Sequence, residues 1–291
     1  MAKNLDDVAE IMRKCIVEHY EVSLDPYCVL PYHRASHTFK DVLSRFKCLV
    51  EAVRAEAYGF LPDDEVEGAT AGVYGHDADQ TFEMVEVNGL LMRKRFSGLI
   101  EPASAMFLAR SMRKVGGFNH KQIDIAVEGV MATVPAWDGQ RMRLTQPNLK
   151  PGVRLTSVLL ALADIGAGVI SGAPFANEGR MVFTEDHLYV LKAFLAVDYD
   201  IDRVRTEDLT SFSTAIINYL GGQVSFLQGQ ADRVEEEILP LVPKETVEPI
   251  RQVCTGTAAA RKSTEDLYAW AKQMRDNEDY ANLFRIMGYP V

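Results

Sequence analysis

Three histidines and two aspartates are the residues of this chain whose types and spacing best suit metal-assisted chemistry. His33 and His37 lie four positions apart in PYHRASHTFKDV, and His76 directly precedes Asp77 in VYGHDADQT. Asp164 ends the apolar segment LTSVLLALAD, where a carboxylate must be paired, capped or ligated because burying it bare is costly. Imidazole nitrogens and carboxylate oxygens together suit Zn, Mn, Fe or Mg. An ion held in this way can activate water and neutralise a phosphoryl oxygen.

Each of these residues also has a purely structural interpretation. A histidine such as His37 on an amphipathic helix is often only a hydrogen-bonded residue. Asp164 precedes GAGV, and aspartate commonly accepts hydrogen bonds from the amides of such a turn. The order of the residues favours the metal interpretation, because a histidine, a His-Asp pair and a later aspartate recur together in one superfamily.

That order, His37, then His76-Asp77, then Asp164, resembles the HD superfamily of metal-dependent phosphohydrolases. The motifs are most similar to the catalytic domain of cyclic-nucleotide phosphodiesterases, and the similarity runs through residues 30–275. PYHRASHTFKDV resembles the family segment YHNxxHxxDV, GHDADQ resembles HDxDH, ALADIGAG resembles HCADLSNP, and GQVSFLQG is similar to SQVGF.

The resemblance implies a metal centre with one or two divalent ions, which would be Zn, Mn, Mg or Fe. His37, His76, Asp77 and Asp164 would hold the first ion, and Asp77 would also bridge to a second. A hydroxide that bridges the ions would attack phosphorus. His33 would be the general acid that protonates the leaving oxygen, a role that suits an imidazole near neutral pH.

The resemblance also assigns four further residues. LIEPASAMFLARSM is similar to the glutamate-bearing helix of the family, and VMATVPAW resembles its VLATD segment, so Glu101 and Thr133 would orient water at the metals. Gln223 would hydrogen-bond the edge of a base, and Phe226 would stack on its face. The implied activity is hydrolysis of a nucleotide phosphodiester or phosphomonoester, with a cyclic nucleotide as the leading small-molecule substrate.

One departure from the family pattern leaves a second function open. Gln80 stands where HDxDH has its second histidine, and a glutamine side chain cannot carry a proton charge. This substitution motivates the alternative of a nucleotide- or metal-binding sensor, a pseudoenzyme that acts through a partner. The enzyme is favoured because all four expected ligands are present. A di-iron oxygenase is less favoured because few further histidines are available for the metals.

Composition and charge argue against several other classes of protein. The chain has 291 residues and a formal net charge of -10, so binding of nucleic acid or of an anionic membrane by charge alone is not expected. No apolar run approaches the roughly 20 residues of a membrane span. The four cysteines form no CxxC pair, which suggests buried thiols in a reducing compartment. We therefore expect a cytoplasmic protein, whose oligomeric state the sequence does not predict.

The spacing of apolar residues predicts an all-α fold, a single multi-helix domain like that of HD proteins and phosphodiesterases. Residues 1–30 are expected to form an N-terminal helical extension packed on the domain, which would span residues 31–291. The Gly221-Gly222 pair is expected to mark helix ends or a close packing point. The expected helices nearest the candidate site cover residues 36–57, 63–76, 80–95, 102–115, 120–133, 153–165, 185–196, 207–220 and 222–238. Two longer loops, residues 134–152 and 166–180, are expected to border the site.

Overall fold

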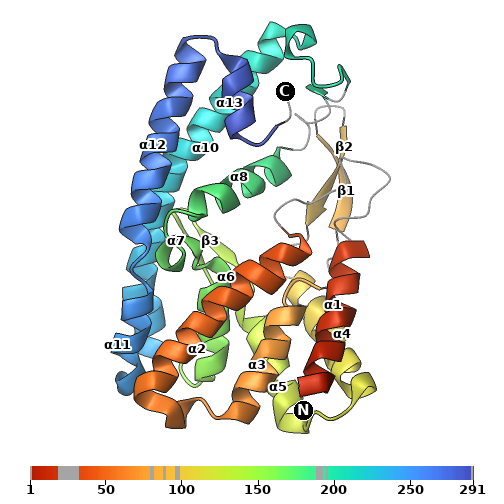
Figure 1. Cartoon of the computed structure of the whole chain (residues 1–291), viewed down its shortest axis with the longest axis vertical. Coiled ribbons are helices and arrows are strands. Elements are labelled where there is room, and N and C mark those ends of the chain that lie inside the picture. The colour runs from red at the N-terminus through yellow and green to blue at the C-terminus, as the bar shows by residue number, and fades with distance from the viewer. Residues whose placement is uncertain are drawn as a thin grey trace.

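The computed structural model describes residues 2–18, 33–78, 82–87, 90–95, 99–187, 193–194, 196–289 and 291. Most of these residues are helical, which confirms the predicted fold class in its coarse form. The two longest helices, α10 (Thr206–Arg233) and α12 (Thr257–Asp276), run side by side along one flank (Figure 1). Within the described ranges, no helix is both long enough and apolar enough to cross a membrane.

Six helices from the first 165 residues pack into one end of the molecule. They are α1 (Ala2–Ile16), α2 (Leu43–Ala57), α3 (Asp63–Gly75), α4 (Ile100–Val115), α5 (His120–Ala132) and α6 (Leu155–Ile165). Helix α5 lies between α3, α4 and α6. Gly68 of α3 makes this packing close, because a Cβ atom built there would lie 2.7 Å from the carbonyl oxygen of Gln122 on α5. The backbones of the two helices are therefore in direct contact.

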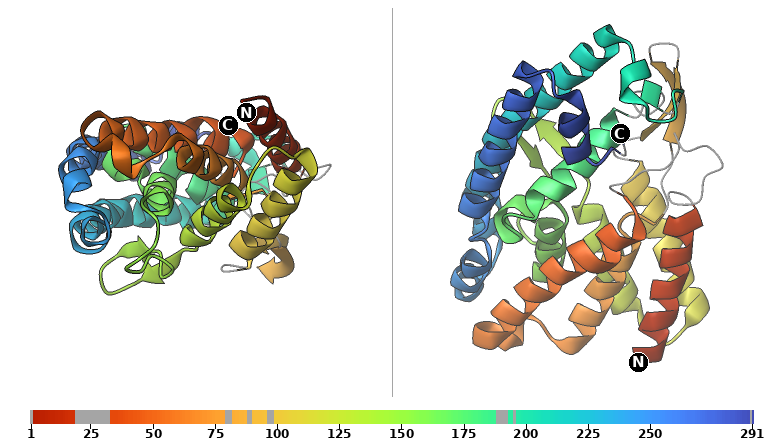
Figure 2. Two further views of the ribbon diagram at one scale, coloured as in Figure 1. Left: turned by 90° about the horizontal axis from the view of Figure 1, so that it is seen from below. Right: turned by 45° about the horizontal axis from the view of Figure 1, so that its top comes forward.

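Helix α1 is part of this packed half. Val8, Met12 and Ile16 recur every four residues and are all buried, as expected for an amphipathic helix with one face on a core. They face α3 and α4, and both views in Figure 2 place α1 beside α4. The expected boundary between residues 30 and 31 lies outside the described residues.

The other end of the molecule is built around an aromatic core. Phe183 of α8 (Phe175–Asp186), Phe212 of α10 and Phe284 of α13 (Tyr280–Ile286) are buried together there. Two further helices of the described residues are α7 (Ala167–Ile170) and α11 (Lys244–Val253). The shorter helical segments are η3 (His37–Val42), η4 (Tyr58–Phe60), η5 (Ile201–Arg203), η6 (Val234–Ile238) and η7 (Leu239–Leu241).

The predicted helix over residues 80–95 is wrong. The described part of this segment is an antiparallel hairpin of β1 (Phe82–Val87) and β2 (Leu90–Arg95). The register pairs Val87 with Leu90, and the sequence between these two residues is Asn-Gly. This dipeptide is the strongest short-range hairpin signal, and it outweighs the apparent helical spacing of the apolar residues.

Three other expected features also need correction. The loop over residues 134–152 contains a second hairpin, β3 (Ala136–Asp138) paired with β4 (Arg143–Thr145), and the loop over 166–180 contains α7 and the start of α8. Gly221 and Gly222 do not end a helix, because α10 runs through them. Packing of α10 against α12 outweighs the cost of about 1 kcal/mol per helical glycine. Much of the helix expected over 185–196 lies outside the described residues.

Candidate metal and substrate site

A pocket of about 490 Å³ lies where several helices end. His76 directly follows α3, Thr133 directly follows α5, and Asp164 belongs to the last turn of α6, and all three line the pocket. The C-terminal end of a helix carries a partial negative charge from its unpaired carbonyl groups. Three such ends therefore favour a cation at the base of this pocket.

His76 and the two aspartates form the base of the pocket. Nε2 of His76 lies 3.1 Å from Oδ2 of Asp77 and 3.5 Å from Oδ1 of Asp164. Nδ1 of the same ring lies 2.8 Å from the carbonyl oxygen of Val73. A carbonyl oxygen can only accept a hydrogen bond, so Nδ1 carries the hydrogen. Nε2 is thus the nitrogen available to a metal ion, and it points to both carboxylates.

His37 completes the cluster from the first turn of η3. Its Nε2 lies 4.0 Å from Oδ2 of Asp77, and ligand atoms of His37, His76 and Asp164 all lie within 4.8 Å of one another. The His33 ring, also buried, lies 6.2 Å from that of His37 between centroids, in an edge-on arrangement. The structure therefore brings together the four residues expected to bind metal and the histidine expected to act as an acid.

The pKa values of the clustered side chains are shifted in different directions. Burial lowers the pKa of His37 well below its usual value, although Asp77 opposes this effect. Burial also lowers the pKa of His76, but Asp77 and then Asp164 raise it more, to about 9. Burial raises the pKa of the Asp164 carboxyl. His37 is therefore neutral near pH 7, whereas His76 must release a proton before Nε2 can coordinate a metal.

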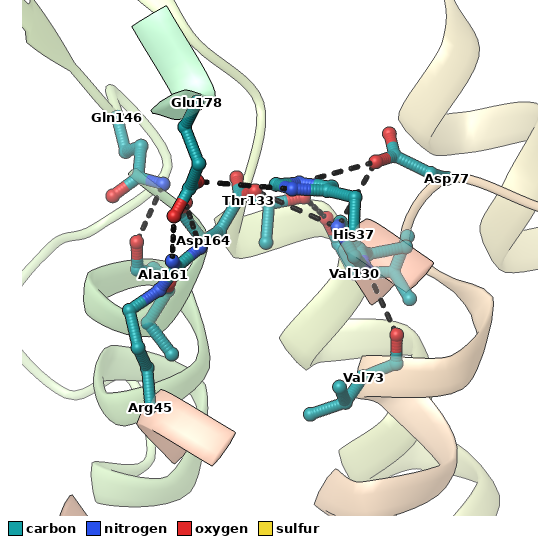
Figure 3. A network of polar contacts seen from close by, with 12 residues as sticks. His37, Arg45, Val73, Asp77, Val130, Thr133, Gln146, Ala161, Asp164 and Glu178 are labelled. Carbon is teal, nitrogen blue, oxygen red and sulfur yellow. Dashed lines mark hydrogen bonds and ion pairs between the residues drawn. The ribbon is translucent and has the colours of Figure 1, made fainter. Parts of the chain in front are cut away.

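Glu178 and Arg45 belong to the site but were missed from the sequence. Oε2 of Glu178 on α8 lies 3.9 Å from Nδ1 of His37. The other carboxylate oxygen accepts a hydrogen bond from Nη1 of Arg45 on α2 at 2.8 Å, as Figure 3 shows. Arg45 also donates to the carbonyl oxygens of Ala163 and Asp164 at 2.6 and 3.3 Å. One signal was available, since Arg45 lies three positions after Val42 and four before Leu49, on the apolar face of its helix.

Glu101 and Thr133 line the same pocket. Glu101 is buried in the first turn of α4, and its charge contributes to the raised pKa of Asp164, which places the two carboxyl groups near each other. The Thr133 hydroxyl donates to the carbonyl oxygen of Val130 at 2.8 Å. Its oxygen lone pairs remain available as acceptors.

Several other side chains of the pocket lining are aromatic. Gln223 and Phe226 lie three positions apart on α10, so they share one face of the helix, and both line the pocket. Phe226 stacks on Phe175 of α8 and on Trp137 of β3, with interplanar angles of 16° and 18°. The sequence-based prediction included Gln223 and Phe226 but missed Phe175 and Trp137, which lie in segments expected to be loops. Gln80 lies outside the described residues.

No family model, curated protein or solved structure matches this chain. The fold and the site define it as a helical protein with a buried His/Asp cluster at the base of a pocket that has an aromatic side.

Proposed function

We propose that this chain is a metal-dependent phosphohydrolase of the HD type that cleaves a nucleotide phosphodiester or phosphomonoester. Cyclic nucleotides are the first substrates to test. The observation that carries the proposal is the convergence of His37, His76, Asp77 and Asp164 at the base of one pocket. These residues come from three separate segments of the chain, and a purely structural role would not require them to meet beside an open cavity.

The donor set fits a divalent metal ion. The Val73 carbonyl fixes the tautomer of His76, and the low pKa of His37 keeps that ring neutral. Burial and then the charge of Asp77 raise the pKa of the Asp164 carboxyl, and a cation would relieve both effects. A mixed nitrogen and oxygen set suits Zn, Mn, Fe or Mg. Such an ion, when bound, supplies a water of lowered pKa and neutralises charge on a phosphoryl oxygen.

Residues around the cluster supply the remaining functions. His33 holds a proton near the ligands and donates it to the oxygen that leaves phosphorus. Glu101 and Thr133 accept hydrogen bonds from water at the base of the pocket and orient it toward the phosphate. Gln223 and Phe226, which line the same pocket, bind the organic part of the substrate.

Elemental analysis of the purified protein and its Asp77→Ala variant tests the metal centre. We expect one or two divalent ions per chain in the wild type and a lower content in the variant. Asp124→Ala, an exposed aspartate on α5, is the matched control and should retain the metal. A wild-type protein that contains no metal and also fails to bind added Mn²⁺ or Mg²⁺ would overturn the proposal.

Hydrolysis of cyclic and linear nucleotides with added Mn²⁺ tests the activity. Turnover that disappears in His37→Ala and Asp77→Ala but persists in Asp124→Ala supports the enzyme. Metal and nucleotide binding without turnover for any of these substrates would instead favour the alternative, a sensor that acts through a partner.

A further inference from the structure

The β3–β4 hairpin forms one wall of the pocket. Trp137, Met142 and Leu144 of this hairpin all line it. Trp137 is 55% exposed and Met142 is 38% exposed, and both are among the most exposed large apolar side chains of the described residues. An indole and a thioether left open beside a cavity mark a surface for an apolar ligand group more than a packing position.

Trp137 is the outermost of three stacked rings. Its centroid lies 6.3 Å from that of Phe226, which lies 6.2 Å from that of Phe175, and the three planes are nearly parallel. Phe175 is buried, Phe226 is half-buried and Trp137 is exposed. The rings come from β3, α10 and α8, so the stack joins three separate elements. A flat aromatic group fits such a stack better than a flexible acyl chain, because parallel ring faces favour another ring.

The hairpin that carries Trp137 is fixed to the rest of the protein. Arg143 of β4 is buried, and its guanidinium group donates to Glu236 at 2.9 Å and to Glu237 at 2.6 Å. Gln230 on α10 donates to the carbonyl oxygen of Leu144 at 3.3 Å. The wall is thus formed before any ligand arrives, which lowers the entropy lost on binding.

Polar groups lie near the aromatic wall. Asn218 and Gln223 of α10 line the same pocket and supply amide donors and acceptors. An amide group can hydrogen-bond the nitrogen and oxygen atoms at the edge of a heteroaromatic ring while the ring face stacks on an indole. The pocket volume of about 490 Å³ falls within the range of small-molecule sites, roughly 300 to 1,000 Å³.

We propose that Trp137 is a specificity-determining residue that stacks on the heteroaromatic ring of an organic phosphate. This inference rests on the proposed function, because it takes the phosphate end of the ligand to lie at the His/Asp cluster. Trp137 touches the ligand and takes no part in the bond cleavage. It selects phosphates that carry a planar ring over those that do not.

Fluorescence of Trp137 itself provides a test that does not depend on turnover. The chain has two tryptophans, so Trp270→Phe on α12 leaves Trp137 as the sole indole. Zn²⁺-loaded Trp270→Phe is titrated with adenosine monophosphate and, as the matched probe without a base, with ribose 5-phosphate. We expect a saturable change in emission with the nucleotide and none with the sugar phosphate. Equal responses to both probes, or none to either, would overturn the inference.

Substitution of Trp137 tests its contribution to affinity by calorimetry. Base stacking on an aromatic residue supports an affinity about tenfold weaker for the nucleotide in Trp137→Ala, with most of the affinity kept in Trp137→Phe. Ribose 5-phosphate should bind all three proteins equally. If Trp137→Ala binds the nucleotide and ribose 5-phosphate more weakly by the same factor, then Trp137 supports the fold or the binding of the phosphate group. The inference would then fail.

The experiments distinguish a failure of the proposed hydrolysis from a failure of the proposed role of Trp137. A nucleotide-dependent signal from Trp137 in a protein that hydrolyses no phosphate ester supports the aromatic subsite and overturns the proposed hydrolysis. Hydrolysis of nucleotides and of sugar phosphates at equal rates, unchanged in Trp137→Ala, supports the phosphohydrolase and overturns the role of Trp137.

Discussion

Oε2 of Glu178 lies 3.9 Å from Nδ1 of His37, on the side of the imidazole ring opposite the nitrogen that faces Asp77. Metal-binding histidines commonly direct their second ring nitrogen to a carboxylate, which orients the ring and strengthens it as a ligand. Arg45 holds Glu178 and also bonds the backbone of Asp164. One arginine therefore holds both the carboxylate that lies beside His37 and the backbone of a second candidate ligand.

Glu178→Gln is predicted to weaken metal binding about 10- to 100-fold while the protein stays folded. The amide keeps the size of the side chain and removes the charge that faces His37. Calorimetric titration of metal-free protein with Zn²⁺ measures the effect. Glu51→Gln, an exposed glutamate on α2, is the control that should bind as the wild type does. If Glu178→Gln and Glu51→Gln bind Zn²⁺ with equal affinity, then Glu178 does not contribute to the metal site.

Arg45→Met is predicted to lower the free energy of unfolding by about 3 to 5 kcal/mol, because it leaves Glu178 buried without its cation. Urea denaturation of the metal-free protein measures the change. The double variant Arg45→Met, Glu178→Met removes both charges and should be more stable than the single variant. A double variant as unstable as the single one would show that packing or backbone contacts of Arg45, and not the charge on Glu178, dominate.

The site residues were predicted from the order of their motifs and from the family resemblance, and two of those motifs were also unusual in their local sequence. Asp164 ends an apolar helix, and the structure places it 3.5 Å from His76. His33 and His37 are four positions apart, and both line the pocket. In each case the local sequence carries a group that needs a partner, so a partner could be expected before its identity was known.

Site residues that come together only through the packing of distant segments could not be predicted from their local sequence. Arg45 and Glu178 are separated by 133 positions, and only the packing of α2 against the rest of the protein brings them together. Trp137 lies in a segment rich in glycine and proline that was expected to be a loop, and its hairpin is held by α10. The β1–β2 hairpin was missed for a different reason, since the apparent helical spacing of the apolar residues was followed and the Asn-Gly dipeptide was not weighed against it.

The thiol of Cys254 is predicted to be almost inert to alkylation at pH 8. Burial raises its pKa to about 12, with a smaller contribution from Glu235, so very little thiolate is present. Cys254 should react about a hundredfold or more slowly than a thiol with the usual pKa of about 8.5. Because the pKa is raised, the rate should keep increasing with pH through pH 10 and 11, where an ordinary thiol has already reached its plateau.

Iodoacetamide labelling followed by peptide mass spectrometry gives these rates residue by residue. Cys48 on α2 is exposed and is the internal comparison. A plateau for Cys254 near pH 9 would mean that water reaches this thiol and that its environment is not apolar. The same raised pKa means that the contribution of Cys254 to stability is full below about pH 8.5 and is lost as the pH rises toward 12.

Two glycines of α10 provide a matched test of how the pocket wall is held. A Cβ atom at Gly229 would lie 2.6 Å from the carbonyl oxygen of Arg141 and 2.8 Å from that of Met142, whereas one at Gly222 would meet nothing within 4 Å. Gly229→Ala should therefore push the hairpin away and cost about 1 to 3 kcal/mol of unfolding free energy. Gly222→Ala should stabilise α10 by about 0.5 to 1 kcal/mol, since alanine favours a helix.

Thermal unfolding followed by circular dichroism measures both changes, and Trp137 emission in the Trp270→Phe background reports on the hairpin. Gly229→Ala should alter this emission because Trp137 moves relative to Phe226, and Gly222→Ala should leave it unchanged. If Gly229→Ala is as stable as the wild type but its Trp137 emission still changes, then the hairpin moves to accommodate the added methyl group at no cost in stability. The wall that carries Trp137 would then be a movable element that adapts to its ligand, and the gain from preorganisation would be lost.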